Sequence, residues 1–121
     1  MATGGSSSSE SLKRATRIRK CMVKLSDRLP SGNSKFLLEC VSEGILTHGE
    51  QEQIHREQDG TQKATMLMGF VIKCTLNDGE SYDSFLELLR EYKLQDLAAI
   101  IKKTAVTQRD LDITKRSYQT V

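Results

Sequence analysis

Apolar residues recur every three to four positions along most of this chain, a pattern typical of helices that bury one face. The first such stretch extends from residue 12 to residue 29 and ends at Pro30-Ser31-Gly32-Asn33, a turn sequence. Basic residues lie opposite the apolar ones around this predicted helix. The predicted buried face consists of Leu12, Ala15, Ile18, Met22, Leu25 and Leu29.

The second and third helices are expected to meet at a tight corner. The second would cover about residues 34–43, and the third would extend to about residue 57. Between them, Gly44 can adopt the positive φ that ends a helix. Thr47, with Glu50 three positions later, has the capping-box pattern that begins one. The two residues between these signals are too apolar to remain in water. The corner is therefore expected to insert Ile45 and Leu46 into a core.

Three more helices are expected after a turn at Asp59-Gly60-Thr61. The helix from about Gln62 to Leu76 is apolar on nearly all sides, which is typical of a central helix. Two further helices, at about residues 81–92 and 95–103, each have one apolar face. Helices joined by turns this short favour an all-α fold, arranged as a small six-helix bundle.

Both ends of the chain are polar, which sets the expected domain boundaries. Residues 1–9 are rich in glycine and serine and are expected to form a disordered tail. Residues 104–121 lack a convincing apolar face and are expected to be a polar tail or linker, which leaves residues 10–103 as the domain. The length of 121 residues suits one domain with a modest core.

Composition favours a cytoplasmic protein. No apolar run reaches the roughly 18 residues that a membrane span requires, and no signal-peptide core follows Met1. The three cysteines are odd in number and widely spaced, so they do not form a disulfide framework and indicate a reducing compartment.

The sequence offers little for catalysis or for cofactor binding. A cysteine–histidine dyad would have to use one of the three cysteines. Each of them lies on or beside an apolar helical face, where a cysteine ordinarily serves as a small buried side chain. Metal sites need clustered ligands, whereas the histidines stand apart. No glycine-rich phosphate-binding loop is present. We therefore expect no enzyme activity, no metal and no cofactor. The residues considered are Cys21, Cys40, Cys74, His48 and His55.

Charges are segregated by sign, although the formal net charge is only +2. Residues 11–29 hold seven basic side chains and one acidic one, whereas residues 39–59 hold six acidic side chains and one basic one. A further acidic strip recurs along residues 80–91. The simpler interpretation is that these charged residues form the solvent-exposed faces of helices. Segregation by sign nevertheless favours an interface, because complementary faces steer two molecules into register. Contacts between unlike faces build open helical assemblies unless the rotation closes.

Nucleic-acid binding is the alternative for the basic first helix, because phosphate contacts need only clustered Lys and Arg. The isoelectric point of about 8.5 is modest, and the neighbouring acidic helices would repel a long polyanion. Aromatic residues do not alternate with the basic ones. An interface with other proteins is therefore the preferred hypothesis.

The order of these features resembles the caspase recruitment domain, a branch of the death-fold superfamily. The resemblance covers about residues 10–103, and its specificity lies in the series rather than in any one motif. The matching segments are, in order, Leu37-Leu38 with Ser42-Glu43-Gly44-Ile45-Leu46-Thr47, Glu50-Gln51-Glu52-Gln53-Ile54, Gln62-Lys63-Ala64, Ser81-Tyr82-Asp83-Ser84-Phe85-Leu86, and Asp96-Leu97-Ala98-Ala99-Ile100-Ile101.

The resemblance implies a six-helix antiparallel bundle of the death fold that binds other caspase recruitment domains. The family includes caspase prodomains, apoptosome and inflammasome components, and adaptors in NF-κB signalling, and its members often form filaments. Its first helix is usually bent, although no Pro or Gly marks a bend here. Partners would be a caspase, receptor or adaptor of the family, or further copies of the chain.

By position, the resemblance also implies two interaction surfaces. The basic surface comprises Arg14, Arg17, Lys20 and Lys24 of the first helix with Lys63 of the fourth. The acidic surface comprises Glu39, Glu43, Glu50 and Glu52 of the second and third helices.

Overall fold

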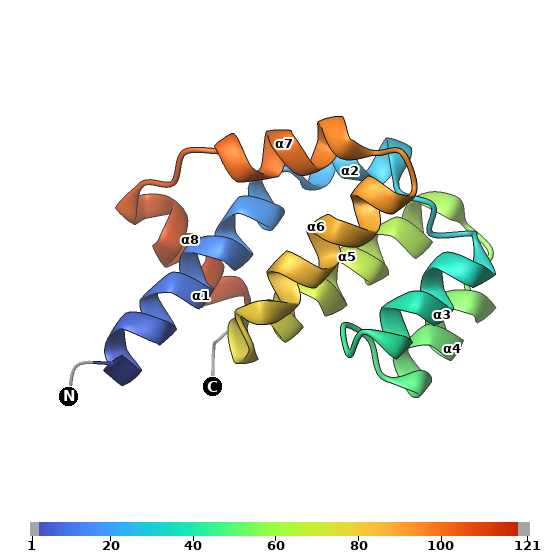
Figure 1. The fold of residues 1–121 in the computed structure, drawn as a ribbon, viewed down its shortest axis with the longest axis horizontal. Coiled ribbons are helices and arrows are strands. Elements are labelled where there is room, and N and C mark those ends of the chain that lie inside the picture. The colour runs from blue at the N-terminus through green and yellow to red at the C-terminus, as the bar shows by residue number, and fades with distance from the viewer. Residues whose placement is uncertain (1–2, 119–121) are drawn as a thin grey trace.

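Eight α-helices make up the part of the chain that the computed structural model describes, residues 3–118, with side chains described from residue 9 onward (Figure 1). No strand occurs in that part, so the predicted all-α class is confirmed. The helices are α1 (Thr3–Lys20), α2 (Met22–Arg28), α3 (Ser34–Ser42), α4 (His48–Arg56), α5 (Gly60–Asn77), α6 (Glu80–Glu91), α7 (Gln95–Lys103) and α8 (Gln108–Tyr118).

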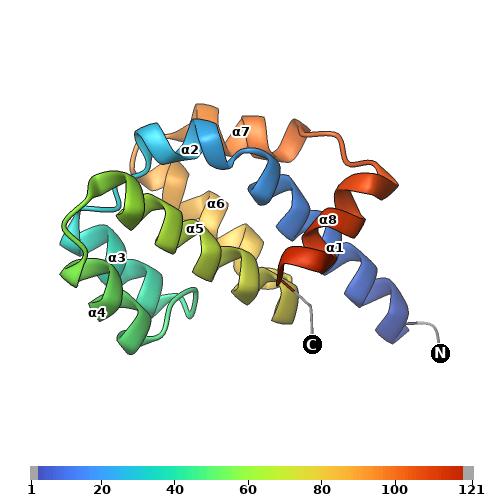
Figure 2. The same cartoon turned by 180° about the vertical axis from the view of Figure 1, so that it is seen from behind.

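Helix α5 is the centre of the molecule, as its nearly uniform apolar character predicts. It packs against α1, α2, α4 and α6. Figure 1 shows α6 on the near side of α5, whereas α2 is on the near side in Figure 2, the view from behind. The side chains of α5 that are buried in these contacts are Ala64, Leu67, Met68, Val71, Ile72 and Thr75. Asp59 caps the start of α5 by accepting the Gln62 N–H at 3.1 Å.

The corner after α3 has the predicted geometry. Gly44 has φ of 78°, and its N–H and that of Ile45 donate to the carbonyls of Val41 and Cys40 at 3.0 and 2.8 Å, which is a Schellman arrangement. The side chain of Thr47 and that of Glu50 form the expected capping box at the start of α4. Ile45 and Leu46 are almost fully buried, so the prediction that the corner docks into the core is confirmed.

The predicted first helix is divided in two. Cys21 separates α1 from α2 with φ of −97° and ψ of 6°, and its N–H donates to Ile18 at 3.0 Å, a tighter turn than an α-helix makes. Neither Pro nor Gly causes this break. The buried Cys21 thiol instead lies 3.2 Å from the hydroxyl of Thr104, at the end of α7. The break lets α2 turn onto α5, where Leu25 is buried.

The ends of the described chain differ from the expectation of polar tails. Helix α1 begins at Thr3, within the segment for which a disordered tail is expected. Residues 108–118 form α8, which packs on α1, so the tail or linker predicted for residues 104–121 is wrong there. Residues 1–2 and 119–121 lie outside the described part.

Within residues 3–118, no helix is both long enough and apolar enough to cross a membrane.

Candidate protein-interaction site

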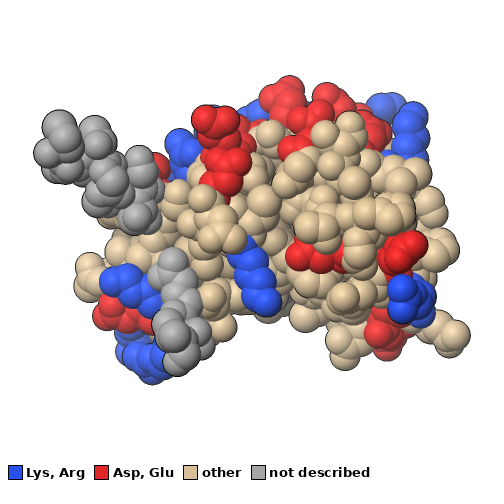
Figure 3. All heavy atoms as spheres, turned by 90° about the horizontal axis from the view of Figure 1, so that it is seen from below, with Lys and Arg blue, Asp and Glu red and all other residues tan. Residues whose placement is uncertain are grey.

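An acidic groove lies between the end of α3 and the exposed side of α6. The four-residue spacing of Asp83, Glu87 and Glu91 places these side chains on one side of α6. Glu43, at the end of α3, faces them across a groove of about 270 Å³. Buried Leu88 contributes to its floor. Acidic atoms gather along the upper edge of the molecule in Figure 3. The acidic groove is therefore defined by Glu43, Asp83, Glu87 and Glu91.

The acidic groove is only partly neutralised within the chain. Arg90 pairs with Glu87 at 2.9 Å, and Arg14 approaches Asp83 at 3.7 Å. Among the described side chains, no ion pair involves Glu43 or Glu91. Carboxylates that share a groove repel one another, and a cationic partner would relieve that repulsion.

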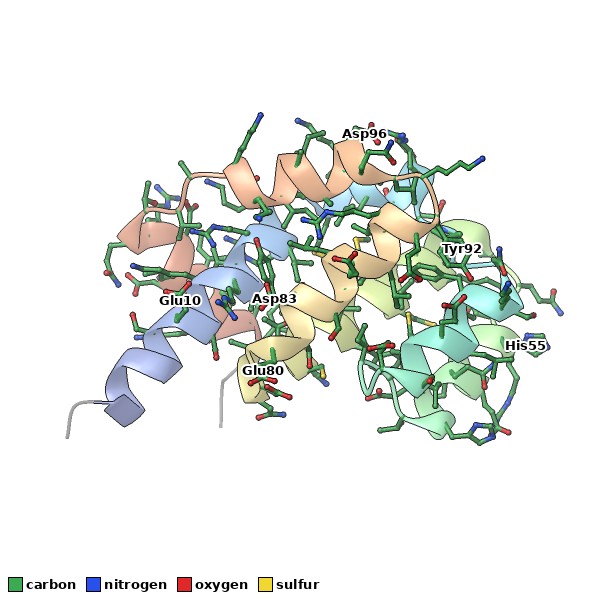
Figure 4. All side chains as sticks on the ribbon, in the orientation of Figure 1. Glu10, His55, Glu80, Asp83, Tyr92 and Asp96 are labelled. Atoms are coloured by element: carbon green, nitrogen blue, oxygen red, sulfur yellow. The ribbon has the colours of Figure 1, made fainter. Side chains whose placement is uncertain are left out.

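Tyr92 fixes the two sides of the groove relative to each other. Its hydroxyl donates a hydrogen bond to the carboxylate of Glu39 at 2.5 Å. Its ring meets that of Phe36 edge-to-face, with 5.0 Å between centroids. In Figure 4, Tyr92 lies where the end of α6 approaches α3. The bond to Glu39, together with burial, raises the pKa of Tyr92 to about 12.

The four residues of the predicted acidic surface do not form one patch. Glu43 lines the acidic groove, while the carboxylate of the half-buried Glu39 accepts the hydrogen bond from Tyr92. Glu50 accepts the Thr47 N–H at 2.9 Å as part of the capping box. Glu52 lies 3.6 Å from Arg56 on the same helix. The acidic strip of α6 is evident in the sequence, but the predicted acidic surface does not include it. The spacing of Asp83, Glu87 and Glu91 was the available signal.

Arg14 and Arg17 of the predicted basic surface act mainly within the fold. Arg14 donates to the carbonyl of Gly79 at 2.9 Å and lies over the Tyr82 ring, 5.5 Å from its centroid. The Nε atom of Arg17 is buried and has no hydrogen-bond partner in the described part of the chain. Burial raises the pKa of Tyr82, and the guanidinium groups of Arg17 and Arg14 oppose this rise. Arg14 therefore joins α1 to the start of α6, and Arg17 lies near Tyr82 of the same helix.

Lys20 and Arg28 hold other helices in place. Lys20 pairs with Asp110 of α8 at 2.8 Å and also donates to the Ala105 carbonyl at 2.9 Å. Lys20 and the backbone and hydroxyl of Thr107 lower the pKa of Asp110 to about 2. Arg28 pairs with Asp96 of α7 and holds the pKa of that carboxyl below its usual range.

Lys24 and Lys63 are the members of the basic surface that are available to a partner. Lys24 is exposed on α2, and Lys63 is half-buried on α5, against which α2 packs. Neither ammonium group makes an ion pair with any carboxylate that the structure describes. Within the basic surface, Arg14 and Lys20 therefore have acidic partners on other helices, whereas Lys24 and Lys63 have none among the described residues.

The cysteines and histidines lie in separate places. Cys21 and Cys40 are buried, and burial with the nearby Glu39 raises the pKa of the Cys40 thiol to about 12. Cys74 is half-buried, with its sulfur 2.9 Å from the Ser81 hydroxyl. His55 points outward from α4 (Figure 4). In the described residues, no three His, Cys, Asp or Glu side chains are grouped so that they could hold a metal ion.

Comparison with known proteins gives a distant relative. No protein-family model matches the chain, and no solved structure matches it. Human apoptotic protease-activating factor 1 is 30% identical over 87 residues, which are 70% of this chain. The chain spans only 7% of that protein's length. It is therefore distantly similar to one segment of a protein whose name places it in the activation of apoptotic proteases.

Proposed function

We propose that this chain is a caspase recruitment domain of the death fold, which assembles cytoplasmic signalling complexes by binding other domains of its kind. Its mechanism is binding without catalysis. Two findings support the proposal. One is the all-helical fold, in which the corner at Gly44 has the geometry expected from the sequence. The other is the distant similarity to apoptotic protease-activating factor 1, which favours an apoptotic role.

The observation that carries the proposal is the separation of two unlike charged faces. The acidic groove is lined by residues at the end of α3 and along α6, two helices that lie on the near side of Figure 1. The available lysines lie on α2 and α5, and α2 is on the near side in Figure 2. One copy can therefore offer its groove to the lysines of a second copy while its own lysines remain free. Such heterologous contacts extend into filaments unless the rotation closes.

Glu43→Lys tests the acidic side of this interface. Lysine suits the end of α3, because a positive charge is favourable at a helix C-terminus, so the fold is expected to persist. We expect self-association, and binding to the isolated caspase recruitment domain of a caspase, to weaken by roughly tenfold or more through lost charge complementarity. Light scattering would measure self-association, and fluorescence anisotropy would measure binding to the caspase's domain. Asp112→Lys, an equal change of charge on the exposed side of α8, serves as the control.

Lys24→Glu completes the same experiment from the basic side. Each variant alone should fail to grow assemblies, since one lacks a working acidic face and the other a working basic face. A mixture of the two should form 1:1 pairs that stop there, because the intact groove of one meets the intact lysines of the other. Assembly and caspase-domain binding by Glu43→Lys equal to those of the parent would overturn the proposal.

Lys24 is a better choice for reversal than Arg17 and Lys20. A carboxylate at position 17 would be partly buried beside Tyr82, and one at position 20 would face Asp110. Both changes would damage packing as well as any interface. The nucleic-acid alternative receives less support, because Arg14 and Lys20 of α1 already pair with carboxylates of the chain.

A further inference from the structure

Helix α8 covers one side of α1 and packs chiefly against that helix. Thr114 is fully buried at the contact, where its hydroxyl is 2.8 Å from that of Thr16 on α1. The Arg19 Nε donates to the same Thr114 oxygen at 2.8 Å, and a second nitrogen of Arg19 reaches the Asp110 carbonyl at 3.3 Å. The centre of the contact between these helices is therefore polar.

An ion pair closes one end of this contact. Asp110 accepts from Lys20 at 2.8 Å and from the Thr107 N–H at 2.9 Å, while its own N–H donates to the Thr107 hydroxyl at 3.2 Å. Asp110 thus caps the start of α8 and also binds it to α1. The same carboxylate occupies Lys20, a member of the basic surface.

Apolar contacts hold α8 less firmly than the other helices. Leu111 and Ile113 remain half-exposed, and Tyr118 packs only at the edge of the core. In contrast, α6 buries four leucine and phenylalanine side chains as well as Tyr82. Because polar contacts exchange with water at little net cost, α8 should be the easiest of these helices to release. Residues 104–107, which are outside the helices, provide the hinge.

We propose that α8 is a removable cover that occupies Lys20 on α1, and that its release adds Lys20 to the lysines that are free to bind a second copy. This inference rests on the proposed function, since it assumes that basic side chains of one copy bind the acidic groove of the next. The Asp110 carboxylate forms the same kind of ion pair with Lys20 that a carboxylate in the acidic groove of a second copy would form. An incoming copy and α8 therefore compete for one ammonium group, so α8 raises the concentration at which assembly begins.

Asp110→Asn tests the cover, with Asp112→Asn as a matched control on the same helix. Asp112 is exposed and bonds only to Gln108 of α8 among the described side chains. Amide hydrogen exchange of residues 108–118 should become several-fold faster in Asp110→Asn and stay unchanged in Asp112→Asn. Light scattering should show assembly of Asp110→Asn at a several-fold lower concentration. Arg19→Gln, which removes the bond to Thr114 without touching the basic surface, should act in the same direction.

Four outcomes are decisive. Faster exchange of α8 with assembly at lower concentration, in both Asp110→Asn and Arg19→Gln, supports the cover. Unchanged exchange in both variants overturns it. Faster exchange with unchanged assembly also overturns it, provided that Glu43→Lys still weakens assembly, because the proposed function then survives while the cover does not. If Glu43→Lys assembles like the parent, the proposed function fails, and the cover fails with it.

Discussion

Gly44 shows how one residue can determine the direction of two helices. Its positive φ ends α3 and directs Ile45 and Leu46 into the core. Helix α4 begins shortly after these two buried residues. A Cβ at this position would meet no atom within 4 Å, so space is not the constraint. The requirement lies in the backbone alone, because a side chain makes the left-handed region unfavourable.

Gly44→Val should lower the free energy of unfolding by about 2 kcal/mol, since a β-branched residue is poorly suited to positive φ. Gly44→Asn should cost less, because asparagine tolerates this region. Urea denaturation followed by circular dichroism would measure both. Gly32→Val is the matched control, since Gly32 is equally open but lacks a positive φ. Equal losses at positions 32 and 44 would contradict the backbone explanation. Loss of binding in Gly44→Val should follow its loss of stability, unlike that in Glu43→Lys.

At the scale of helices, Tyr92 is the contact that joins α3 to the end of α6. The hydroxyl bonds to Glu39 and the ring packs on Phe36, so one side chain supports both walls of the acidic groove. The hydrogen bond needs a protonated phenol. Because folding raises the pKa of Tyr92 from about 10 to about 12, this stabilisation is complete below pH 10 and is lost as the pH rises through 12.

Tyr92→Phe should lower the free energy of unfolding at pH 7 by about 1 kcal/mol, the net contribution of one hydrogen bond. The variant should also lose less stability than the parent between pH 10 and pH 12. Chemical denaturation at a series of pH values would measure both effects. Tyr82→Phe is the control at pH 7, because the buried Tyr82 hydroxyl has no partner among the described residues and its removal should cost less. A larger loss for Tyr82→Phe than for Tyr92→Phe would contradict this account.

Apolar periodicity predicted the helices that bury an apolar face, together with the corner that joins two of them. It could not predict α8, because α8 meets α1 through Thr114 and Asp110, which look like solvent-facing residues in the sequence. The break at Cys21 was equally hidden, since it accompanies a contact with Thr104, 83 positions away. The break depends on a tertiary contact that leaves no local signal, whereas the spacing of Thr107 and Asp110 was a local signal for the start of α8.

Charge patterns located the candidate site only in outline. Lys20 and Lys24 are equivalent in the sequence, four positions apart on one predicted helix. The structure separates them, because Asp110 pairs with Lys20 whereas Lys24 faces solvent. Likewise, the capping role of Glu50 could be read from its spacing to Thr47, but the bond between Glu39 and Tyr92 could not. Residue type selects the candidates, and only tertiary pairing shows which of them are free.

For the whole molecule, two charged faces on an aliphatic core make assembly and stability respond differently to salt. The core is built largely of buried leucine, isoleucine and alanine, whose packing does not depend on ionic screening. The two faces would attract through exposed charges, and the screening length falls from about 10 Å at 0.1 M salt to about 3 Å at 1 M.

Raising the salt concentration from 0.1 to 1 M should increase the concentration needed for assembly by roughly tenfold, because exposed charge pairs are screened. Helicity should not change over the same range. Light scattering and circular dichroism on one set of samples would measure the two quantities. Assembly that strengthens with salt would point to an apolar interface instead, since salting-out favours burial of apolar surface.

The contact between α1 and α8 also has a consequence for the order of events during synthesis. Lys20 and Asp110 are 90 positions apart. Because ribosomes add about 5–20 residues per second, Asp110 is added roughly 5 to 18 s after Lys20. Each nascent chain therefore passes through an interval in which α1 has been synthesised but α8 has not. Ribosomes that translate one message hold several such chains close together, so the first meeting between copies can precede completion of either.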